Sequence, residues 1–227
     1  MNNFQIQNLK NNRIRIVPPT TECCEYKYMG GKINTKTLHS LISNGYSKKP
    51  KTVSNIDGYE MDKSLSGTRA QVYHNPTTNH LVVNHRGTKG IHDVVTDIRL
   101  MFGDKSNKRF QHGKKITDEA LKKYDTDNVT ICGHSLGSQI ASEANKKHNK
   151  ETIVVNPAMI PSEITKKQKD NETVIRSKLD PISYLHSLNP FASKSRTITI
   201  KSKSMNPLTE HSSDVLNRLD PNMDVGV

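Results

Sequence analysis

The chain has 227 residues and a formal net charge of +12 at pH 7, with 34 Lys and Arg against 22 Asp and Glu. This length suits one domain with a substantial core and is short for two. Only 32% of the residues are hydrophobic, so the core must be concentrated in a few central strands beneath a very polar surface. No stretch reaches the length of a membrane span and the first residues lack the apolar segment of a secretory signal, so we expect a soluble protein.

The net charge indicates which partners the protein attracts, and the cysteines indicate its redox compartment. A basic surface attracts polyanions, which include acidic membrane surfaces and nucleic acid. With seven Tyr, four Phe and no Trp, and no zinc-finger or helix-turn-helix pattern, the sequence disfavours nucleic acid as the main ligand. The cysteines are an adjacent pair, Cys23 and Cys24, and Cys132 in an expected buried strand, which favours a reducing compartment. The missing signal also leaves room for another secretion route.

Residues 1–66 form the least regular part of the sequence. They are polar and rich in Asn and Lys, and they predict one helix from Thr35 to Ile42, capped by Thr35. We interpret residues 1–66 as an N-terminal lead-in that packs on the core, and residues 67–227 as the main domain.

From Gly67 onward, strand and helix patterns alternate. Short runs typical of strands occur at 69–74, 80–84, 128–132, 152–156, 174–177 and 196–201. The first two predict a hairpin, and a helix capped by Thr117 separates the second from the third, which makes a βαβ unit. The pattern predicts an α/β fold, a mostly parallel sheet flanked by helices, with a ligand site at the carboxyl ends of the strands.

The sequence Gly133-His134-Ser135-Leu136-Gly137 directly follows one of these strands and precedes a helical pattern. In a G-x-S-x-G turn between a strand and a helix, the serine hydroxyl projects from the sheet as a nucleophile. The N–H of Leu136 then lies at a helix start, where it can donate to an oxyanion. A turn without a catalytic role is the alternative interpretation.

A serine nucleophile needs a histidine base and an acid that orients it. Asp180 follows a strand and precedes Pro181, so it should lie on the same rim as Ser135, although a solvated turn residue fits the same pattern. Of the histidines after Ser135, His148 follows that turn too closely, and His186 follows Asp180 without an intervening strand. His211 lies beyond the last strand and is the expected base.

The second oxyanion donor should come from the loop after an earlier strand. Thr88, in His85-Arg86-Gly87-Thr88, is the expected donor. Arg86 either binds an anion or forms a buried pair with Asp93 or Asp97 that braces the loop.

Four segments in this order resemble the class 3 lipase family: Leu81 to Thr88, Asp93 to Asp97, Gln111 to Gly113, and Gly133 to Gly137. The resemblance implies an α/β-hydrolase fold, a triad of Ser135, Asp180 and His211, and acyl ester bonds of lipids as the substrate. The sequence departs from the family at Val94, Lys114 and Ser138, where Trp, an aromatic residue and Gly are usual.

The resemblance also bears on substrate access. The apolar cluster Leu100-Met101-Phe102 is either a small lid, as in the family, or part of an ordinary helix on the core. A second apolar stretch, from Ile182 to Phe191, is a candidate lining for an acyl groove. The chemistry requires no metal and no cofactor, and calcium dependence stays open.

We therefore expect a serine hydrolase that cleaves carboxylic esters of lipids through an acyl-enzyme. The basic charge favours peripheral contact with anionic membrane surfaces. Two alternatives remain: an acyl thioesterase or acyltransferase of the same fold, and a catalytically idle hydrolase fold that serves as a basic binding or structural protein.

Overall fold

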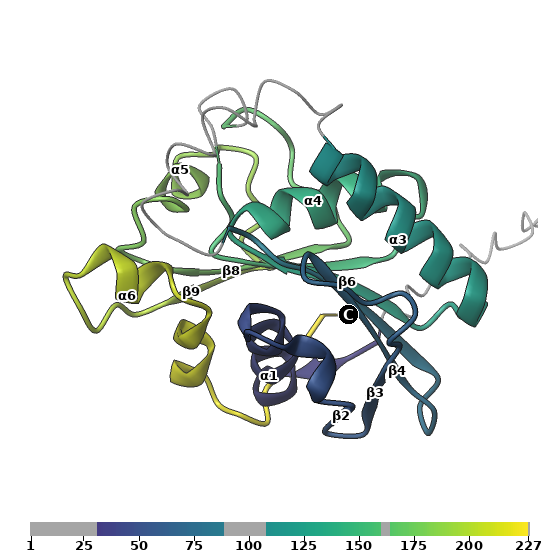
Figure 1. The fold of residues 1–227 in the computed structure, drawn as a ribbon. Helices are drawn as coiled ribbons and strands as arrows, with labels where there is room; N and C mark the ends of the chain where they lie inside the picture. The colour runs from purple at the N-terminus through teal and green to yellow at the C-terminus, as the bar shows by residue number, and fades with distance from the viewer. Residues whose placement is uncertain (1–30, 89–107, 160–163, 227) are drawn as a thin grey trace, which may run out of the picture.

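The computed structural model describes residues 31–88, 108–159 and 164–226. Its centre is an eight-stranded sheet in the order β2-β3-β4-β5-β6-β7-β8-β9 (Figure 1). The strands are β2 (Asn55–Ile56), β3 (Tyr59–Met61), β4 (Ala70–Asn75), β5 (His80–His85), β6 (Val129–His134), β7 (Glu151–Val155), β8 (Glu172–Ser177) and β9 (Thr197–Ile200). A separate antiparallel pair, β1 (Ile33–Asn34) and β10 (Asp224–Val225), joins the two ends of the described chain.

The sheet is antiparallel from β2 to β5 and parallel from β5 to β9. The expected hairpin is present, because β4 and β5 pair from Ala70 opposite His85 to Asn75 opposite His80. The expected βαβ unit is present as well, since helix α3 (Lys108–Tyr124) connects β5 to its parallel neighbour β6. The prediction of a mostly parallel sheet in an α/β fold is confirmed.

Helices cover both faces of the sheet (Figure 1). One face carries α3, α4 (Leu136–Ala144) and the short α5 (Tyr184–Ser187), and a 3₁₀ turn, η2 (Asn145–Lys147), follows α4. The other face carries α1 (Thr35–Tyr46), with the 3₁₀ segments η1 (Pro50–Thr52) and η4 (Ser213–Arg218). Helix α6 (Pro207–His211) lies beyond β9 at the edge of the sheet.

The alternation of side chains along the strands divides the core into two layers. On β5, Leu81 and Val83 pack with the α3 face, whereas Val82 packs with the α1 face. Strands covered on both faces need apolar residues at successive positions, which explains the continuous apolar runs in the sequence. The buried apolar surface therefore lies directly above and below β5, β6 and β7.

Helix α1 differs from its prediction in length and in its cap. It runs four residues further than expected, to Tyr46, and its N-cap is Asn34, whose side chain accepts from the N–H of Thr37 at 2.8 Å. Thr35 itself lies inside the helix. Leu38 and Leu41 of α1 are fully buried against the sheet, and β2 and β3 extend that same sheet. The boundary between residues 66 and 67 stays a prediction.

The prediction that Thr117 caps a helix is wrong. Helix α3 begins at Lys108, and Thr117 lies buried in its interior, where its hydroxyl oxygen is 3.0 Å from His85 Nε2. The hydroxyl pairs with a side chain of the sheet and is therefore not needed as a cap. Ile116 and Ala120 on the same helix are buried against the sheet.

Several predictions fall on residues that the structure leaves undescribed. The Leu100-Met101-Phe102 cluster, Asp93, Asp97, Cys23 and Cys24 all lie outside the described ranges. Within those ranges, no helix has the length and apolar character needed to cross a membrane.

Candidate active site

Ser135 occupies a sharp turn between β6 and α4. Its φ of 58° lies in the left-handed region, which is strained for a residue with a side chain. The surrounding backbone holds it there: the Ser135 N–H donates to the Val155 carbonyl at 3.0 Å, and the Ser135 carbonyl accepts from the N–H of Ser138 at 3.0 Å. Strain of this kind, sustained by neighbouring hydrogen bonds, is typical of a nucleophile elbow.

The two glycines of the turn are required by close backbone contact. A Cβ on Gly133 would lie 2.3 Å from the Gly137 carbonyl oxygen, and a Cβ on Gly137 would lie 1.9 Å from the carbonyl oxygen of His85. Both distances are far inside van der Waals contact with backbone atoms. Any larger residue would therefore push α4 away from β5 and β6.

His211 and Asp180 lie in line with Ser135. His211 Nε2 is 2.8 Å from Ser135 Oγ, and His211 Nδ1 is 3.0 Å from both carboxylate oxygens of Asp180. All three side chains are buried. The carboxylate of Asp180 also accepts from the backbone N–H groups of Ile182 and Ser183, which fixes its orientation.

The backbone around His211 is held by side chains from the sheet. Asn156, directly after β7, donates through Nδ2 to the carbonyls of Glu210 at 2.9 Å and Ser212 at 3.1 Å. Glu210 is itself fully buried and pairs with Arg218 at 2.7 Å. These contacts fix the end of α6 over the carboxyl ends of the parallel strands.

The two expected oxyanion donors, Leu136 and Thr88, both lie near Ser135. Leu136 is the first residue of α4, where backbone N–H groups lack an acceptor within the helix. Thr88 follows β5 and lines a cavity of about 320 Å³ together with Ser135 and His211. The loop that carries Thr88 is held by Arg109, which donates to the Arg86 carbonyl at 2.9 Å.

Arg86 lies beside this loop, with its guanidinium 6.0 Å from the centre of the Tyr46 ring. Its expected alternatives, an anion or a pair with Asp93 or Asp97, involve groups that the structure does not describe.

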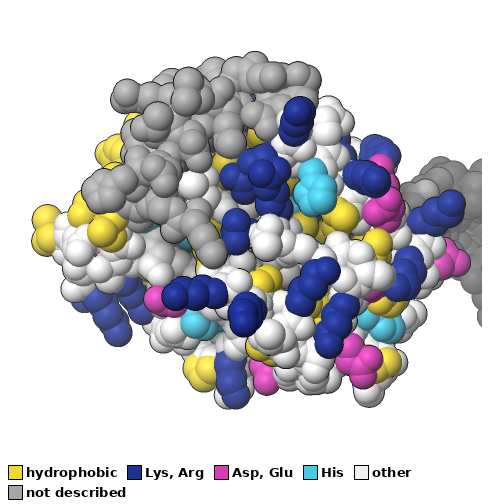
Figure 2. All heavy atoms as spheres, viewed as in Figure 1, with side chains coloured by type: hydrophobic (Ala, Val, Ile, Leu, Met, Phe, Trp, Pro, Cys, Tyr) yellow, Lys and Arg dark blue, Asp and Glu magenta, His cyan; other side chains and the backbone are white. Residues whose placement is uncertain are grey.

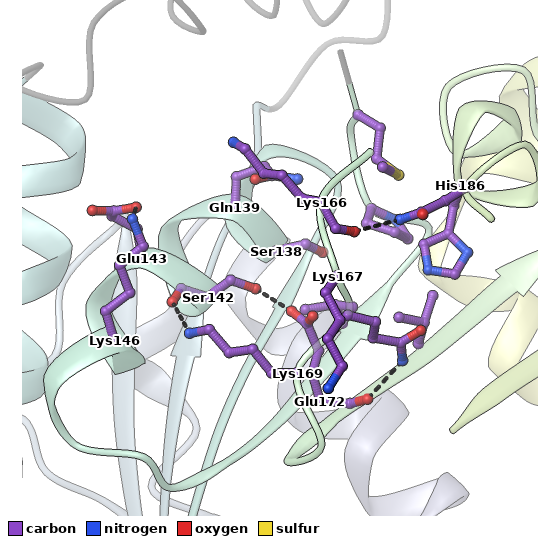
Figure 3. Close-up of a pocket in the computed structure, with 16 residues that line it drawn as sticks. Ser138, Gln139, Ser142, Glu143, Lys146, Lys166, Lys167, Lys169, Glu172 and His186 are labelled. Atoms are coloured by element: carbon purple, nitrogen blue, oxygen red, sulfur yellow. Dashed lines mark hydrogen bonds and ion pairs between the residues drawn. The ribbon is translucent and has the colours of Figure 1, made fainter. Parts of the chain in front are cut away.

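The other two candidate histidines lie elsewhere. His148 Nε2 is 2.7 Å from Asp118, which ties η2 to α3. His186 of α5 is buried beside a second cavity of about 220 Å³, and burial lowers its pKa to about 4. Figure 3 shows this cavity between Ser138 and Ser142 of α4 and the lysines Lys166, Lys167 and Lys169. It contains none of the three in-line residues.

Sequence reasoning missed the residues that support the site. Tyr46 of α1 and His134 of the elbow line the cavity beside Ser135, and Asn156 and Glu210 hold α6. The sequence did hold a signal for two of them. His134 lies within the G-x-S-x-G motif, and Asn156 is a polar residue at the end of a predicted strand. Tyr46 had no such signal, because it lies at the end of a helix in the segment that looked least regular.

No group of three or more His, Cys, Asp or Glu side chains that could hold a metal occurs in the described part of the chain. The Cys132 thiol is buried in β6, and burial raises its pKa to about 12.

Comparison with known proteins gives the family. Residues 42–183, more than half of the sequence, match the model of the Tle-like phospholipase domain. The chain belongs to this family. No curated protein sequence matches the Tle-like chain.

The chain is also similar, at low sequence identity, to solved structures. The structure of a mutant form of MDLA from Penicillium cyclopium has a TM-score of 0.50 and 14% identity, over 76% of this chain and 80% of that chain. Lip2 lipase from Yarrowia lipolytica has a TM-score of 0.43 and 14% identity, over 68% of this chain and 77% of that chain. The expected class 3 lipase-like fold of α/β-hydrolase type is confirmed.

Two departures from the class 3 pattern are accommodated locally in the Tle-like domain. The Ser138 hydroxyl is buried and donates to the Gly133 carbonyl at 2.9 Å, so it reinforces the elbow. Lys114 of α3 forms an ion pair with Glu143 of α4 at 3.2 Å. Both side chains therefore contribute to the packing of α4. They stand at positions where the class 3 lipase pattern has Gly and an aromatic residue.

Proposed function

We propose that this protein is a serine hydrolase that cleaves carboxylic ester bonds of lipids through an acyl-enzyme. The observation that carries the proposal is the line of hydrogen bonds from Asp180 through His211 to Ser135 Oγ, at 3.0 and 2.8 Å, at the tip of a strained elbow. Membership of a phospholipase-like family supports lipid esters as the substrate class.

In the proposed mechanism, His211 Nδ1–H donates to Asp180, which leaves the Nε2 lone pair to accept the proton of Ser135. Ser135 Oγ attacks the ester carbonyl, and the resulting oxyanion accepts hydrogen bonds from the N–H of Leu136 and from Thr88. The imidazolium then protonates the leaving alcohol. Water, deprotonated by His211, hydrolyses the acyl-enzyme and restores the serine.

We also propose that the protein works at an anionic lipid surface. Leu208 lines the Ser135 cavity and is 45% exposed, and Met205, three residues before it in the chain, is 86% exposed. Lys178, Lys201 and Lys203 are exposed at the ends of β8 and β9, where the N–H of Leu179 donates to Ser202 Oγ and the N–H of Lys203 donates to Glu210 of α6. Figure 2 shows hydrophobic side chains over α6 with Lys or Arg side chains next to them. Apolar side chains can enter a bilayer while lysines contact acidic headgroups. We name Lys178, Lys201, Lys203, Met205 and Leu208 the rim patch.

Replacing Ser135 tests the nucleophile. We expect Ser135→Ala to abolish labelling by a fluorophosphonate probe and to reduce kcat on a short-chain ester by about 10⁶-fold, as is typical when a triad serine is removed. Circular dichroism and thermal unfolding of the variant should match the wild type, because the elbow glycines and the sheet stay intact.

The histidines provide the matched comparison for this experiment. His211→Ala should be nearly as inactive as Ser135→Ala, whereas His148→Ala and His186→Ala should keep most of the activity. Full activity in Ser135→Ala or His211→Ala would refute the triad. A wild type that neither labels nor hydrolyses esters would instead favour the idle binding fold, and faster cleavage of thioesters than of oxygen esters would favour the thioesterase alternative.

A further inference from the structure

A buried series of hydrogen bonds connects the oxyanion loop to the backbone of the base. The N–H of Gly87 lies 3.0 Å from the Tyr46 hydroxyl oxygen, which lies 2.8 Å from Nδ1 of His134. Nε2 of His134 lies 2.6 Å from the carbonyl oxygen of His211. The series thus joins α1, the residue before Ser135, the residue before Thr88, and the end of α6.

Each hydrogen bond in this series has only one possible direction. A carbonyl only accepts, so Nε2 of His134 must carry the hydrogen that it donates to His211. A neutral His134 then has a lone pair on Nδ1, which accepts the hydroxyl hydrogen of Tyr46. The Tyr46 oxygen in turn accepts from the N–H of Gly87.

The surroundings keep both side chains in these states. Burial, together with the neighbouring His211 ring, lowers the pKa of His134 to about 3, so His134 is uncharged at neutral pH. Burial raises the pKa of the Tyr46 hydroxyl, so Tyr46 retains the hydrogen that it donates. The rings of Tyr46 and His134 pack edge to face, with centroids 5.5 Å apart, which limits the rotation of both.

The series completes a clamp on the base. Asn156 holds the carbonyls of Glu210 and Ser212, and His134 holds the carbonyl of His211 between them. At its other end, Tyr46 holds Gly87, whose neighbour Thr88 is the proposed oxyanion donor. The base and the oxyanion loop are therefore held by one rigid group, which lies directly beside the nucleophile.

We infer that Tyr46 and His134 are positioning residues of this active site: they hold His211 and the Gly87-Thr88 loop in a common register over Ser135. The inference rests on the proposed hydrolase function. It gives α1 an indirect part in catalysis, through the position of other residues, and it gives His134 a role that its place in the elbow does not require.

Tyr46→Phe removes one hydroxyl and keeps the ring. Without it, the N–H of Gly87 and Nδ1 of His134 lose their partner in a buried site, so the loop and the base can drift apart. We expect kcat on a soluble short-chain ester to fall about 10- to 100-fold with KM nearly unchanged. The group acts on the geometry of the reacting atoms, which explains the split between kcat and KM.

The chain supplies a matched control in Tyr59→Phe. The Tyr59 hydroxyl is also buried, lies 2.6 Å from Nδ1 of His80, and has its ring edge to face with that histidine, at 5.6 Å between centroids. His80 begins β5, at the opposite end of the strand from the catalytic side chains. Tyr59→Phe should lower the midpoint of thermal unfolding about as much as Tyr46→Phe does. Its kcat should equal that of the wild type. Equal kcat values for the two variants would overturn the inference.

His134 allows rescue by a conservative variant. The amide of Gln can donate to the His211 carbonyl and accept from Tyr46, whereas Leu can do neither. His134→Gln should keep most of kcat and His134→Leu should lose it, and Tyr46→Phe/His134→Leu should be no slower than His134→Leu alone, because the pair acts as a unit. Equal losses of kcat for Gln and Leu, or additive losses in the double variant, would contradict the positioning role of this hydrogen-bond series.

Nitrogen-15 NMR of the histidine rings tests the geometry without activity. We expect a neutral His134 with its hydrogen on Nε2, and resonances of His134 and His211 that shift in Tyr46→Phe and stay in place in Tyr59→Phe. Unshifted His134 and His211 resonances in Tyr46→Phe would overturn the inferred hydrogen-bond series. A wild type with no Ser135-dependent activity would refute the proposed hydrolase. The NMR result would then show by itself whether Tyr46, His134 and His211 are joined by hydrogen bonds.

Discussion

At the scale of single residues, the buried carboxylate of Glu210 lies next to His211, the proposed base. Glu210 accepts hydrogen bonds from Ser177, Arg218 and the backbone N–H groups of Lys203 and Ser204. Burial alone would raise the pKa of Glu210, but these donors outweigh it and hold the pKa at about 2. Glu210 thus fastens α6 to the end of β8 and to the loop that follows β9.

This carboxylate should make stability depend on acid. In the unfolded chain a Glu binds a proton near pH 4.3. Because the folded pKa is lower, the stabilisation by Glu210 is complete above that value and is lost as the pH falls toward about 2. We expect Glu210→Gln to lower the unfolding free energy by about 1–3 kcal/mol at pH 6, and by less at pH 3, in urea titrations.

Glu119→Gln is the control for this measurement. Glu119 is partly exposed and lies 3.8 Å from Lys115 on the same helix, so its loss should change the unfolding free energy by less than about 0.5 kcal/mol at either pH. A deficit in Glu210→Gln that stays the same from pH 6 to pH 3 would show that the ionised carboxylate is not the stabilising form.

At the scale of elements, α1 is part of the core that supports the site. Its Leu38, Leu41 and Ile42 are buried in the same cluster as Val82 of β5 and Ile153 of β7, and its last residue, Tyr46, lines the Ser135 cavity. A helix from the segment expected to be a lead-in therefore covers one face of the sheet.

Leu41→Ala tests whether α1 folds with the sheet. A fully buried Leu truncated to Ala typically costs about 2–5 kcal/mol, and we expect a loss of this size in one cooperative urea transition, with catalytic activity lost at the same urea concentration. Lys36→Ala, at an exposed position of α1, should change stability by less than about 0.5 kcal/mol. A Leu41→Ala variant as stable as Lys36→Ala would indicate that residues 31–66 fold as a separate lead-in.

At the scale of the whole molecule, we expect the charge of +12 and the rim patch to act together at an anionic lipid surface. Leu179, next to Lys178, has its N–H bonded to Ser202 Oγ at 2.8 Å, so the ends of β8 and β9 share this edge with α6. The Ser135 cavity is thus lined by the exposed Leu208 of α6, and the strand ends that share this edge carry the exposed lysines of the rim patch.

This arrangement predicts a dependence on surface charge and salt. Anionic phospholipid vesicles should be hydrolysed faster than zwitterionic ones at low salt, because each lysine near an acidic surface contributes about 1 kcal/mol to binding. The advantage should fade as salt shortens the reach of surface charge to about 10 Å at 0.1 M. Rates on both kinds of vesicle at two salt concentrations provide the measurement.

The apolar part of the rim patch is tested on the same vesicles. Met205→Ser should slow vesicle hydrolysis and leave the rate on a soluble ester unchanged, while Val53→Ser, at an exposed apolar position outside the rim patch, should change neither. Equal rates on anionic and neutral vesicles at both salt concentrations would leave a hydrolase of soluble esters.

The features that depend on near neighbours in the chain could be predicted from the sequence. The hairpin of β4 and β5, the strand before Ser135 and the helix after it follow from patterns only a few residues long, because apolar alternation and glycine geometry act locally. The candidates Asp180 and His211 followed from the order of the strands. Local pattern misjudged Thr117, since its hydroxyl is occupied by His85 of a neighbouring strand.

The sequence by itself thus determined the fold class and the three candidate catalytic residues, because both are written in local pattern and chain order. The supporting contacts were decided only by the tertiary structure. Tyr46 and His134 are 88 positions apart, and Asn156 reaches Glu210 across 54 positions. A hydrogen bond between such residues has no local signature, since it exists only once the sheet has brought α1, the elbow and α6 to one rim.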